Sequence, residues 1–337
     1  MQDTAASLAG CLIGQALGDA LGFVVESAPP ETAADYVECC LLAPRAGTRS
    51  HPGYDVGQYT DDTQLARELL RSIRESARWD PASFAGHLAG LFRENRAVCA
   101  GPGTRESAGR LVAGIGWRES GQPAPYAGNG SAMRAAPLGV FFRNDPARML
   151  DAARDQSLVT HRDSRCVAGA MAVAGAAALA SLREWRTADV FLEQVAVWVE
   201  DDDRSVADAI RGVAAWIDLA PDEAARRLHA SGLDSMYADS WLGISAFVTP
   251  SLAWSLYAFL RTPDDYWATI CTAIGVGGDT DTMAAMAGAM SGARLGVDVL
   301  PADLVSKLHD RGDWKAPELV ALAHDCAALA PAFAHDG

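Results

Sequence analysis

Lysine is nearly absent from this sequence. Only Lys307 and Lys315 occur among 337 residues, and 43 acidic residues against 28 basic ones give a formal net charge of −15. Proteins that bind the nucleic-acid backbone need clustered Lys and Arg side chains to neutralise its phosphates. Because the arginines here are spread along the chain, strong binding to a nucleic-acid backbone is not expected.

Paired cysteine motifs are also missing. The seven cysteines include no Cys-x-x-Cys spacing and the seven histidines are scattered, so no structural zinc site is expected. An odd number of cysteines without a framework spacing fits a reducing compartment. No basic region precedes the first apolar stretch, which argues against a secretory signal. A cytoplasmic location is therefore expected.

A hydrophobic run of membrane-spanning length is lacking as well. The most apolar window, residues 166–182, is rich in Ala and Gly and is bracketed by Arg165 and Arg183. A typical span needs about 20 consecutive apolar residues, and this window is shorter. The window therefore predicts a buried helix, and no membrane partner is expected.

The alternating pattern of β-strands is scarce, whereas helical periodicity prevails, so the fold class is predicted to be all-α. Half of the residues are apolar, enough for one large core or two modest ones, and Ala-rich helical stretches at both ends favour a single domain over residues 1–337. Loops are expected at the Pro and Gly clusters, residues 28–30, 44–57, 100–103 and 121–130. Helices are predicted at residues 4–22, 63–77, 81–97, 104–115, 146–157, 164–182, 187–200, 204–218, 221–229, 248–260, 264–274, 282–295, 301–309 and 317–330.

Glycine recurs at every fourth position in two of the predicted helices. The first stripe starts at Gly10 and ends at Gly22, and the second starts at Gly288 and ends at Gly296. Residues four apart lie on one face of a helix. Since each interior glycine costs about 1 kcal/mol relative to alanine, another backbone is expected to approach each stripe closely.

Two short acidic segments stand out against these absences, Thr60-Asp61-Asp62-Thr63 and Gly277-Gly278-Asp279-Thr280-Asp281-Thr282. Residues 50–66 and 262–293 contain no Lys or Arg, so ion pairs close in sequence cannot neutralise the four carboxylates. Two carboxylates about 4 Å apart repel by roughly 4 kcal/mol at an effective dielectric of about 20. If the fold brings the segments together, cations are needed there.

The residue types of both segments suit a hard divalent cation. Carboxylates, threonine hydroxyls and backbone carbonyls are oxygen ligands, which favour Mg²⁺, Mn²⁺ or Ca²⁺ over zinc or copper. One segment alone is more simply explained as a helix N-cap. An EF-hand is excluded for the second segment, because Met290 stands where the bidentate Glu belongs. Two segments of the same kind favour one shared metal site.

Three further features are weaker when taken singly. The loop Gly128-Asn129-Gly130 could present backbone N–H groups to an anion, or simply turn the chain before a helix. His161 could contact a polar substrate or cap and pack a helix. Glu26 closes the first glycine-striped helix and is one acid among many.

Five segments nevertheless occur in a specific order: Gly14-x-x-x-Gly18-Asp19-x-x-Gly22-x-x-x-Glu26, Tyr59-Thr60-Asp61-Asp62-Thr63, Gly128-Asn129-Gly130-x-x-Met133-Arg134, Thr160-His161 and Gly277-Gly278-Asp279-Thr280-Asp281-Thr282. In this order the chain resembles the ADP-ribosylglycohydrolase family over about residues 5–296. The resemblance implies a compact, orthogonal multi-helix fold with a dimetal cleft that holds two Mg²⁺ or Mn²⁺ ions.

The resemblance also assigns residues to roles. Metal ligands would come from Thr60, Asp61 and Asp62 on one side and from Asp279, Asp281 and Thr282 on the other. The acid or base would be Glu26, Asp61 or Asp279, a choice that stays open. The substrate would contact Asp61, Tyr126, Ala127, Gly128, Asn129, Gly130, Ser131 and His161, with Tyr126, Tyr237 or Trp241 against the adenine.

The expected activity is hydrolysis of the glycosidic bond between ADP-ribose and a modified acceptor. Residues 95–107 are expected at the cleft mouth, where Gly101-Pro102-Gly103-Thr104 resembles the arginine-directed bacterial branch of the family. The partner would therefore be an ADP-ribosylated protein or small molecule, most simply one modified on arginine. A non-catalytic ADP-ribose-binding protein and a helical dimetal hydrolase of nucleotides or pyrophosphates are the alternatives. The second alternative is weakened because Asp61-Asp62 is followed by Thr63-Gln64-Leu65 and so does not form an Asp-Asp-x-x-Asp motif.

Overall fold

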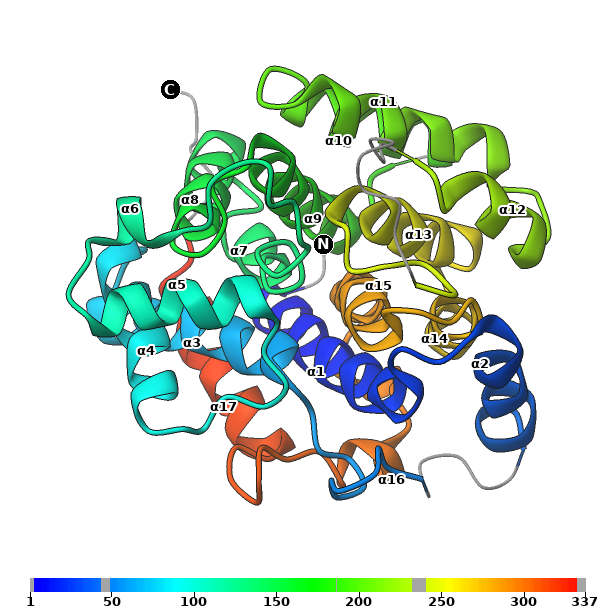
Figure 1. Cartoon of the computed structure of the whole chain (residues 1–337), viewed down its shortest axis with the longest axis horizontal. Helices are drawn as coiled ribbons and strands as arrows, with labels where there is room; N and C mark the ends of the chain where they lie inside the picture. The colour runs from blue at the N-terminus through cyan, green and yellow to red at the C-terminus, as the bar shows by residue number, and fades with distance from the viewer. Residues whose placement is uncertain (1–2, 44–48, 186, 232–240, 332–337) are drawn as a thin grey trace.

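The structure is a computed structural model that describes residues 3–43, 49–185, 187–231 and 241–331. Within these ranges the chain is helical and forms isolated β-bridges but no β-strand, which confirms the predicted all-α class (Figure 1). The helices are α1 (Thr4–Gly22), α2 (Pro30–Tyr36), α3 (Asp61–Ser76), α4 (Pro81–Arg93), α5 (Pro102–Val112), α6 (Trp117–Ser120), α7 (Ala136–Phe141), α8 (Pro146–Leu158), α9 (Ser164–Leu182), α10 (Ala188–Val199), α11 (Arg204–Val213), α12 (Pro221–Leu228), α13 (Val248–Arg261), α14 (Tyr266–Ile274), α15 (Thr280–Leu295), α16 (Ala302–Val305) and α17 (Ala316–Ala327).

Several predicted boundaries were wrong. Helix α4 ends at Arg93 instead of residue 97, because Asn95 takes a left-handed conformation with φ 53° that stops the helix. Only Ala302–Val305 of the predicted helix 301–309 is helical. The short helices α2, α6 and α7 were not predicted, since four to seven residues are too few to show a period clearly.

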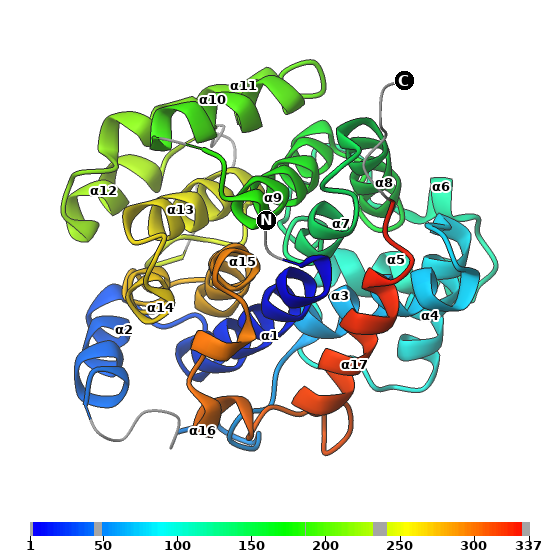
Figure 2. The ribbon, with the colours of Figure 1, turned by 180° about the vertical axis from the view of Figure 1, so that it is seen from behind.

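Helices α1 and α15 pack against each other along their lengths at the centre of the molecule (Figures 1 and 2). A Cβ added to Gly14 would collide with the backbone carbonyl of Gly288, and one added to Gly10 would collide with that of Gly292. The two glycine stripes therefore face each other, and the predicted close backbone approach is confirmed. This contact fixes how the ends of α1 and α15 lie relative to one another.

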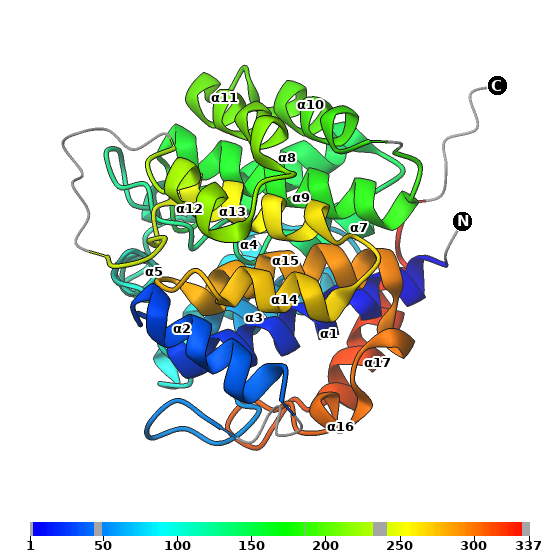
Figure 3. The ribbon, with the colours of Figure 1, turned by 90° about the vertical axis from the view of Figure 1, so that its right-hand side faces the viewer.

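Further helices cover this central pair in layers. Figure 3 shows α9 and α13 above α15, with α10 and α11 outermost. Contrary to the expectation that no run is long enough to span a membrane, α1 with η1 (Phe23–Val25) and α9 are each long and apolar enough by length and composition. Most of each is buried inside the protein, as in the core helices of soluble proteins. The predicted buried helix over residues 166–182 is confirmed.

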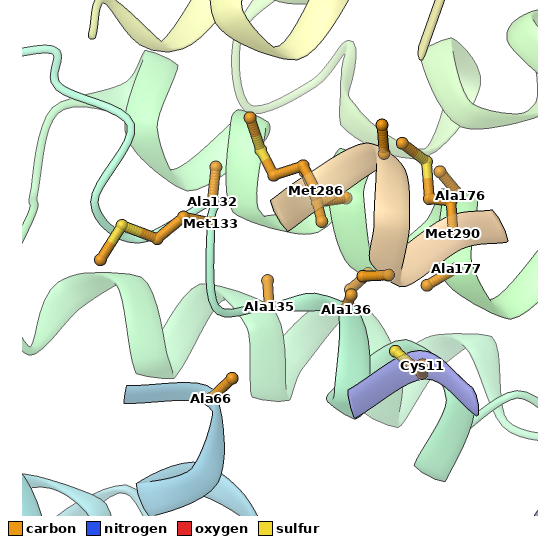
Figure 4. Close-up of a cluster of buried hydrophobic side chains, with 14 of the residues drawn as sticks. Cys11, Ala66, Ala132, Met133, Ala135, Ala136, Ala176, Ala177, Met286 and Met290 are labelled. Carbon is orange, nitrogen blue, oxygen red and sulfur yellow. The ribbon is translucent and has the colours of Figure 1, made fainter. Parts of the chain in front are cut away.

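Small side chains let the helices of the core approach closely. Figure 4 shows Ala176 and Ala177 of α9 near Met290 of α15, with Ala135 and Ala136 beneath them. All of these side chains are buried. Flexible methionines fill the gaps that alanines leave, so the core is dense without large aromatic residues at this point.

The C-terminal end of α1 meets the N-terminal ends of α3 and α15. The Thr280 hydroxyl donates to the Gly22 carbonyl over 2.8 Å, which joins α15 to α1. Thr60, the N-cap of α3, donates its backbone N–H and its hydroxyl to Asp19 of α1. Both acidic segments are thus brought to one place from positions about 200 residues apart in the chain.

Candidate metal and substrate site

Four of the site's carboxylates lie at or next to the N-terminus of a long helix. Asp61 and Asp62 are in the first turn of α3, Asp279 is the N-cap of α15, and Asp281 is in its first turn. The positive end of a helix dipole favours negative charge at these positions. Each of the four side chains is at most 5% exposed, so water alone does not solvate them.

Two glycines turn the chain into α15. Gly277 and Gly278 have φ values of 72° and 87°, a left-handed conformation that side chains rarely adopt. The Gly278 carbonyl accepts the Ser27 N–H over 2.8 Å, which draws the end of the 3₁₀ helix η1 (Phe23–Val25) to this turn. As a result, carboxylate oxygens of Glu26, Asp279 and Asp281 lie within 4.8 Å of one another.

The opposite acidic segment supplies carboxylate oxygens without partners. Asp61 Oδ2 and Asp62 Oδ1 are buried and have no hydrogen-bond partner among the residues that the structure describes. An unpaired buried carboxylate oxygen is costly, whereas a hard cation would satisfy it. The donor set is all oxygen, as Mg²⁺ and Mn²⁺ prefer, so the residues present fit a divalent metal site.

The electrostatics of the site agree with this fit. Burial, followed by the charges of neighbouring carboxylates, raises the pKa of Asp61, Asp62 and Asp281 well above the ordinary value. Burial and the charges of Asp279 and Asp19 raise the pKa of Glu26 to about 7. Ionising all of these groups together is unfavourable without a cation nearby.

Asp19 is a site residue whose role the sequence did not reveal. It is the only charged residue in the otherwise apolar α1 and is fully buried. It accepts hydrogen bonds from the backbone N–H and the hydroxyl of both Thr60 and Thr63, at 2.6 to 3.1 Å. Asp19 therefore caps α3 from a different helix and holds Asp61 and Asp62 in place. A lone acid in an apolar, glycine-striped helix was the available signal.

A cavity of about 270 Å³ opens beside the carboxylates. The predicted site residues that line it are Glu26, Asp61, Asp62, Tyr126, Gly128, Asn129, Gly130, His161, Asp279, Asp281 and Thr282, and Trp241 lies there as well. Cys99, Gly101, Thr104 and Arg105 form part of the wall, where residues 95–107 were expected. The structure thus gathers seven separate stretches of sequence around one cavity.

Three predicted site residues do not line the cavity. The Thr60 hydroxyl lies within hydrogen-bond distance of Asp19 and Asp62, so its first role is to hold α3 and orient Asp62. The Ala127 carbonyl accepts from Val248 of α13. Ser131 bonds to Cys166 and Ser157 behind the cavity wall. Tyr237, one of the adenine candidates, lies outside the described residues.

Asn129 links the substrate loop to the acidic cluster. Its Nδ2 donates to Asp279 Oδ2 over 2.5 Å and to the Ser251 hydroxyl of α13 over 2.9 Å. The backbone N–H of Asn129 donates to the Ala246 carbonyl, which fixes the loop from its other side. Because Asn129 holds Asp279, displacement of the loop would also displace a carboxylate of the site.

Comparison with known proteins gives consistent matches over nearly the whole chain. A family model described as ADP-ribosylglycohydrolase matches residues 1–334. The chain is 29% identical to ADP-ribosylhydrolase ARH3 of Mus musculus, over 87% of this chain and 84% of that protein. It is 27% identical to the ADP-ribosyl-[dinitrogen reductase] glycohydrolase of Rhodospirillum rubrum, over 89% of both chains.

Two further matches bear on the acceptor and on the fold. The chain is 27% identical to ADP-ribosylarginine hydrolase Tri1 of Pseudomonas putida, over 89% of this chain and 73% of that protein. A solved structure titled ADP-ribosylglycohydrolase-related protein complex superposes with a TM-score of 0.73 at 25% identity, covering 98% of this chain and 99% of that one.

Proposed function

Because this chain belongs to the ADP-ribosylglycohydrolase family, we propose that it is a metal-dependent hydrolase that removes ADP-ribose from modified arginine side chains. One observation carries the metal dependence. The unpartnered oxygens of Asp61 and Asp62 and the group of Glu26, Asp279 and Asp281 border the same cavity. No described cation forms an ion pair with any of these five carboxylates.

Five side chains are proposed to hold the cations. Asp61 and Asp62 would bind from α3, and Asp279, Asp281 and Thr282 from α15, with Mg²⁺ or Mn²⁺ as the ion. Two such ions would supply Lewis acidity at the ribose and a water of lowered pKa. Thr60 and Asp19 would keep the α3 ligands in position, since both already contact this turn.

Glu26 is the proposed proton carrier. Asp61 is almost fully buried and Asp279 accepts a hydrogen bond from Asn129, whereas Glu26 is partly exposed to the cavity. It follows a three-residue 3₁₀ helix instead of lying within a long helix. Glu26 can therefore take a proton from the attacking water at its carboxylate and return it to the leaving group.

The remaining cavity walls are proposed to bind the ADP-ribosyl group. Gly128, Asn129 and Gly130 present a tight loop to the cavity, and His161 lies against Gly130. Tyr126 and Trp241 offer aromatic faces for the adenine. Tyr126 is also held in place, because its hydroxyl accepts the Gly103 N–H at the start of α5 over 3.0 Å.

Arginine is favoured as the acceptor by the name of one relative. The relative Tri1 is named as an ADP-ribosylarginine hydrolase.

The test compares two substrates that differ only in the acceptor. Peptides carrying ADP-ribose on arginine or on serine are incubated with the protein and Mg²⁺, and released ADP-ribose is measured. Faster release from arginine supports the proposal, and release from serine alone rejects the acceptor. Binding of ADP-ribose without release from either peptide would favour a non-catalytic binding protein. Asp61→Asn and Asp279→Asn variants should release less than about 1% of the wild-type amount.

A further inference from the structure

A buried guanidinium lies directly behind the cavity wall. Arg134 is fully buried, and its four hydrogen bonds go to neutral acceptors: Gln156 Oε1 at 2.7 Å, the Gln156 carbonyl at 2.9 Å, the Gly130 carbonyl at 3.0 Å and Thr160 Oγ1 at 2.7 Å. None of the described acids lies within ion-pair distance of it. The charge of Asp61 acts on Arg134 without forming an ion pair. Burial of a cation that has no ion-pair partner is costly, so a role beyond packing is expected.

Thr160 joins Arg134 to the cavity. Its hydroxyl oxygen lies 2.7 Å from Arg134 Nη2 and 2.7 Å from His161 Nδ1. A guanidinium nitrogen can only donate, so the Thr160 oxygen must accept from Arg134. The Thr160 hydroxyl must still donate its own proton. Within the described residues, its only other hydrogen-bonding neighbour is His161 Nδ1.

The direction of the hydrogen bond between Thr160 and His161 follows from the single proton of the Thr160 hydroxyl. If His161 Nδ1 carried a proton, the Thr160 oxygen would accept twice and its own proton would be buried without an acceptor. If Nδ1 is bare, it accepts the Thr160 hydroxyl proton, and both groups are satisfied. The neutral imidazole must then carry its proton on Nε2.

The surroundings of His161 agree with a neutral ring. Burial and the nearby charge of Arg134 lower the pKa of His161 to about 3. Burial lowers the pKa of Arg134 itself to about 9, so Arg134 remains a cation at neutral pH. His161 lines the cavity, and its Nε2 has no partner within the described residues.

We propose that Arg134 and Thr160 are positioning residues that hold His161 as its Nε2–H tautomer, so that Nε2 donates a hydrogen bond to an oxygen of the bound ADP-ribosyl group. His161 therefore binds and orients the substrate and does not act as a base. The inference rests on the proposed function only in naming ADP-ribose as the ligand. The tautomer itself is a property of the free protein.

The first test determines the tautomer of His161 in the absence of metal and substrate, so it does not depend on turnover. Protein labelled with ¹⁵N-histidine is examined by long-range ¹H–¹⁵N NMR at neutral pH, and a His161→Gln variant identifies the signals of His161. The wild-type ring should show a protonated Nε2 and a bare, hydrogen-bonded Nδ1. A proton on Nδ1, or an even mixture of tautomers, overturns the proposal.

The second test uses a matched pair at Thr160. Thr160→Val keeps the shape and removes the hydroxyl, whereas Thr160→Ser keeps the hydroxyl. The valine variant should lose the fixed tautomer and bind ADP-ribose about tenfold more weakly in calorimetry, while the serine variant behaves like wild type. Unchanged affinity with an altered tautomer would overturn the role in binding. If the valine variant does not fold, the wild-type spectrum and the serine variant still decide the question.

Failure of this inference can be distinguished from failure of the proposed function. A protein that releases no ADP-ribose can still show the Nε2–H tautomer and the loss of it in Thr160→Val. Conversely, an active hydrolase whose His161 is protonated on Nδ1 keeps the proposed function and rejects the positioning role.

Discussion

Glu26 differs from the other carboxylates of the site in its position and in its exposure. Its neighbours Asp61, Asp62, Asp279 and Asp281 are held at helix N-termini, whereas Glu26 follows the short η1 helix and is partly exposed. In the proposed function, this difference separates the residues that would hold a cation from the one that would exchange protons with the substrate and with water.

The variant Glu26→Gln tests that separation. It keeps the size and polarity of the side chain but cannot carry a proton, so kcat should fall by about 100- to 1,000-fold. The affinity for ADP-ribose should change by less than about threefold. Steady-state kinetics and calorimetry measure the two quantities. A kcat within about twofold of wild type would rule out Glu26 as the proton carrier.

Asp19 provides a second prediction at the scale of one residue. Asp19→Asn replaces one accepting oxygen by an NH₂ group that faces the N–H groups of Thr60 and Thr63, so α3 should shift. Mutation of a group that orients metal ligands typically lowers metal affinity by about 10- to 100-fold. Mn²⁺ titration followed by electron paramagnetic resonance should show a loss in this range. The control Asp35→Asn, on an exposed position of α2, should bind Mn²⁺ as wild type does.

At the scale of helices, the contact between α1 and α15 places the two acidic segments. The contact depends on glycines that face each other's backbone carbonyls. That each stripe packs closely could be predicted from the sequence, because glycine at every fourth position destabilises a helix unless another backbone approaches it. That the two stripes pair with each other could not be predicted, since nothing in either stripe specifies its partner.

The variant Gly14→Ala tests the contact. Its Cβ would collide with the Gly288 carbonyl, and the two backbones would have to separate. The free energy of unfolding, measured with urea, should fall by at least about 2 kcal/mol. The matched control is Gly86→Ala in α4, where nothing lies within 4 Å of the added Cβ. This control should be neutral or stabilising by up to about 1 kcal/mol, and an equal loss in both variants would contradict the account.

Helix α3 is also anchored through ion pairs on the side away from the cavity. Glu68 contacts Arg67 at 2.7 Å and Arg71 at 2.9 Å, and Arg67 reaches Asp310 from the C-terminal part of the chain. Burial raises the pKa of Glu68, but the hydrogen bond from His87 and the charges of Arg67 and Arg71 outweigh it, so the net pKa is lowered.

The pH dependence of stability follows from this lowered pKa. The ordinary pKa of Glu68 is 4.5. Its ion pairs therefore stabilise the fold above about pH 4.5, and the stabilisation is lost as pH falls through the lower, folded-state pKa. Glu68→Gln should lower the free energy of unfolding by about 3 kcal/mol at pH 7, with a smaller difference at pH 3. Urea titrations at both pH values measure it, with Glu318→Gln, exposed on α17, as the control. A difference that does not shrink at pH 3 would contradict the assignment.

At the scale of the whole molecule, helical periodicity was enough to predict the all-α class and the order of the motifs was enough to predict the family, and both predictions are confirmed. The motifs carried this information because most of them occupy a helix end or a turn where few residue types fit, and the first lies where α1 packs closely against α15. The roles of Asp19, Arg134 and Thr160 could not be predicted in the same way. Asp19 meets Thr60 and Thr63, and Arg134 meets Thr160, only in the folded protein. The single domain over residues 1–337 and the cytoplasmic location stay predictions.

The central claim is that carboxylates from two ends of the chain together hold a pair of divalent cations. Anomalous diffraction from crystals grown with Mn²⁺ tests it most directly. Two anomalous peaks should lie among Asp61, Asp62, Asp279 and Asp281, and they should disappear in crystals of Asp61→Asn combined with Asp279→Asn. If wild-type crystals grown with saturating Mn²⁺ show no anomalous peak among these four carboxylates, the account is contradicted.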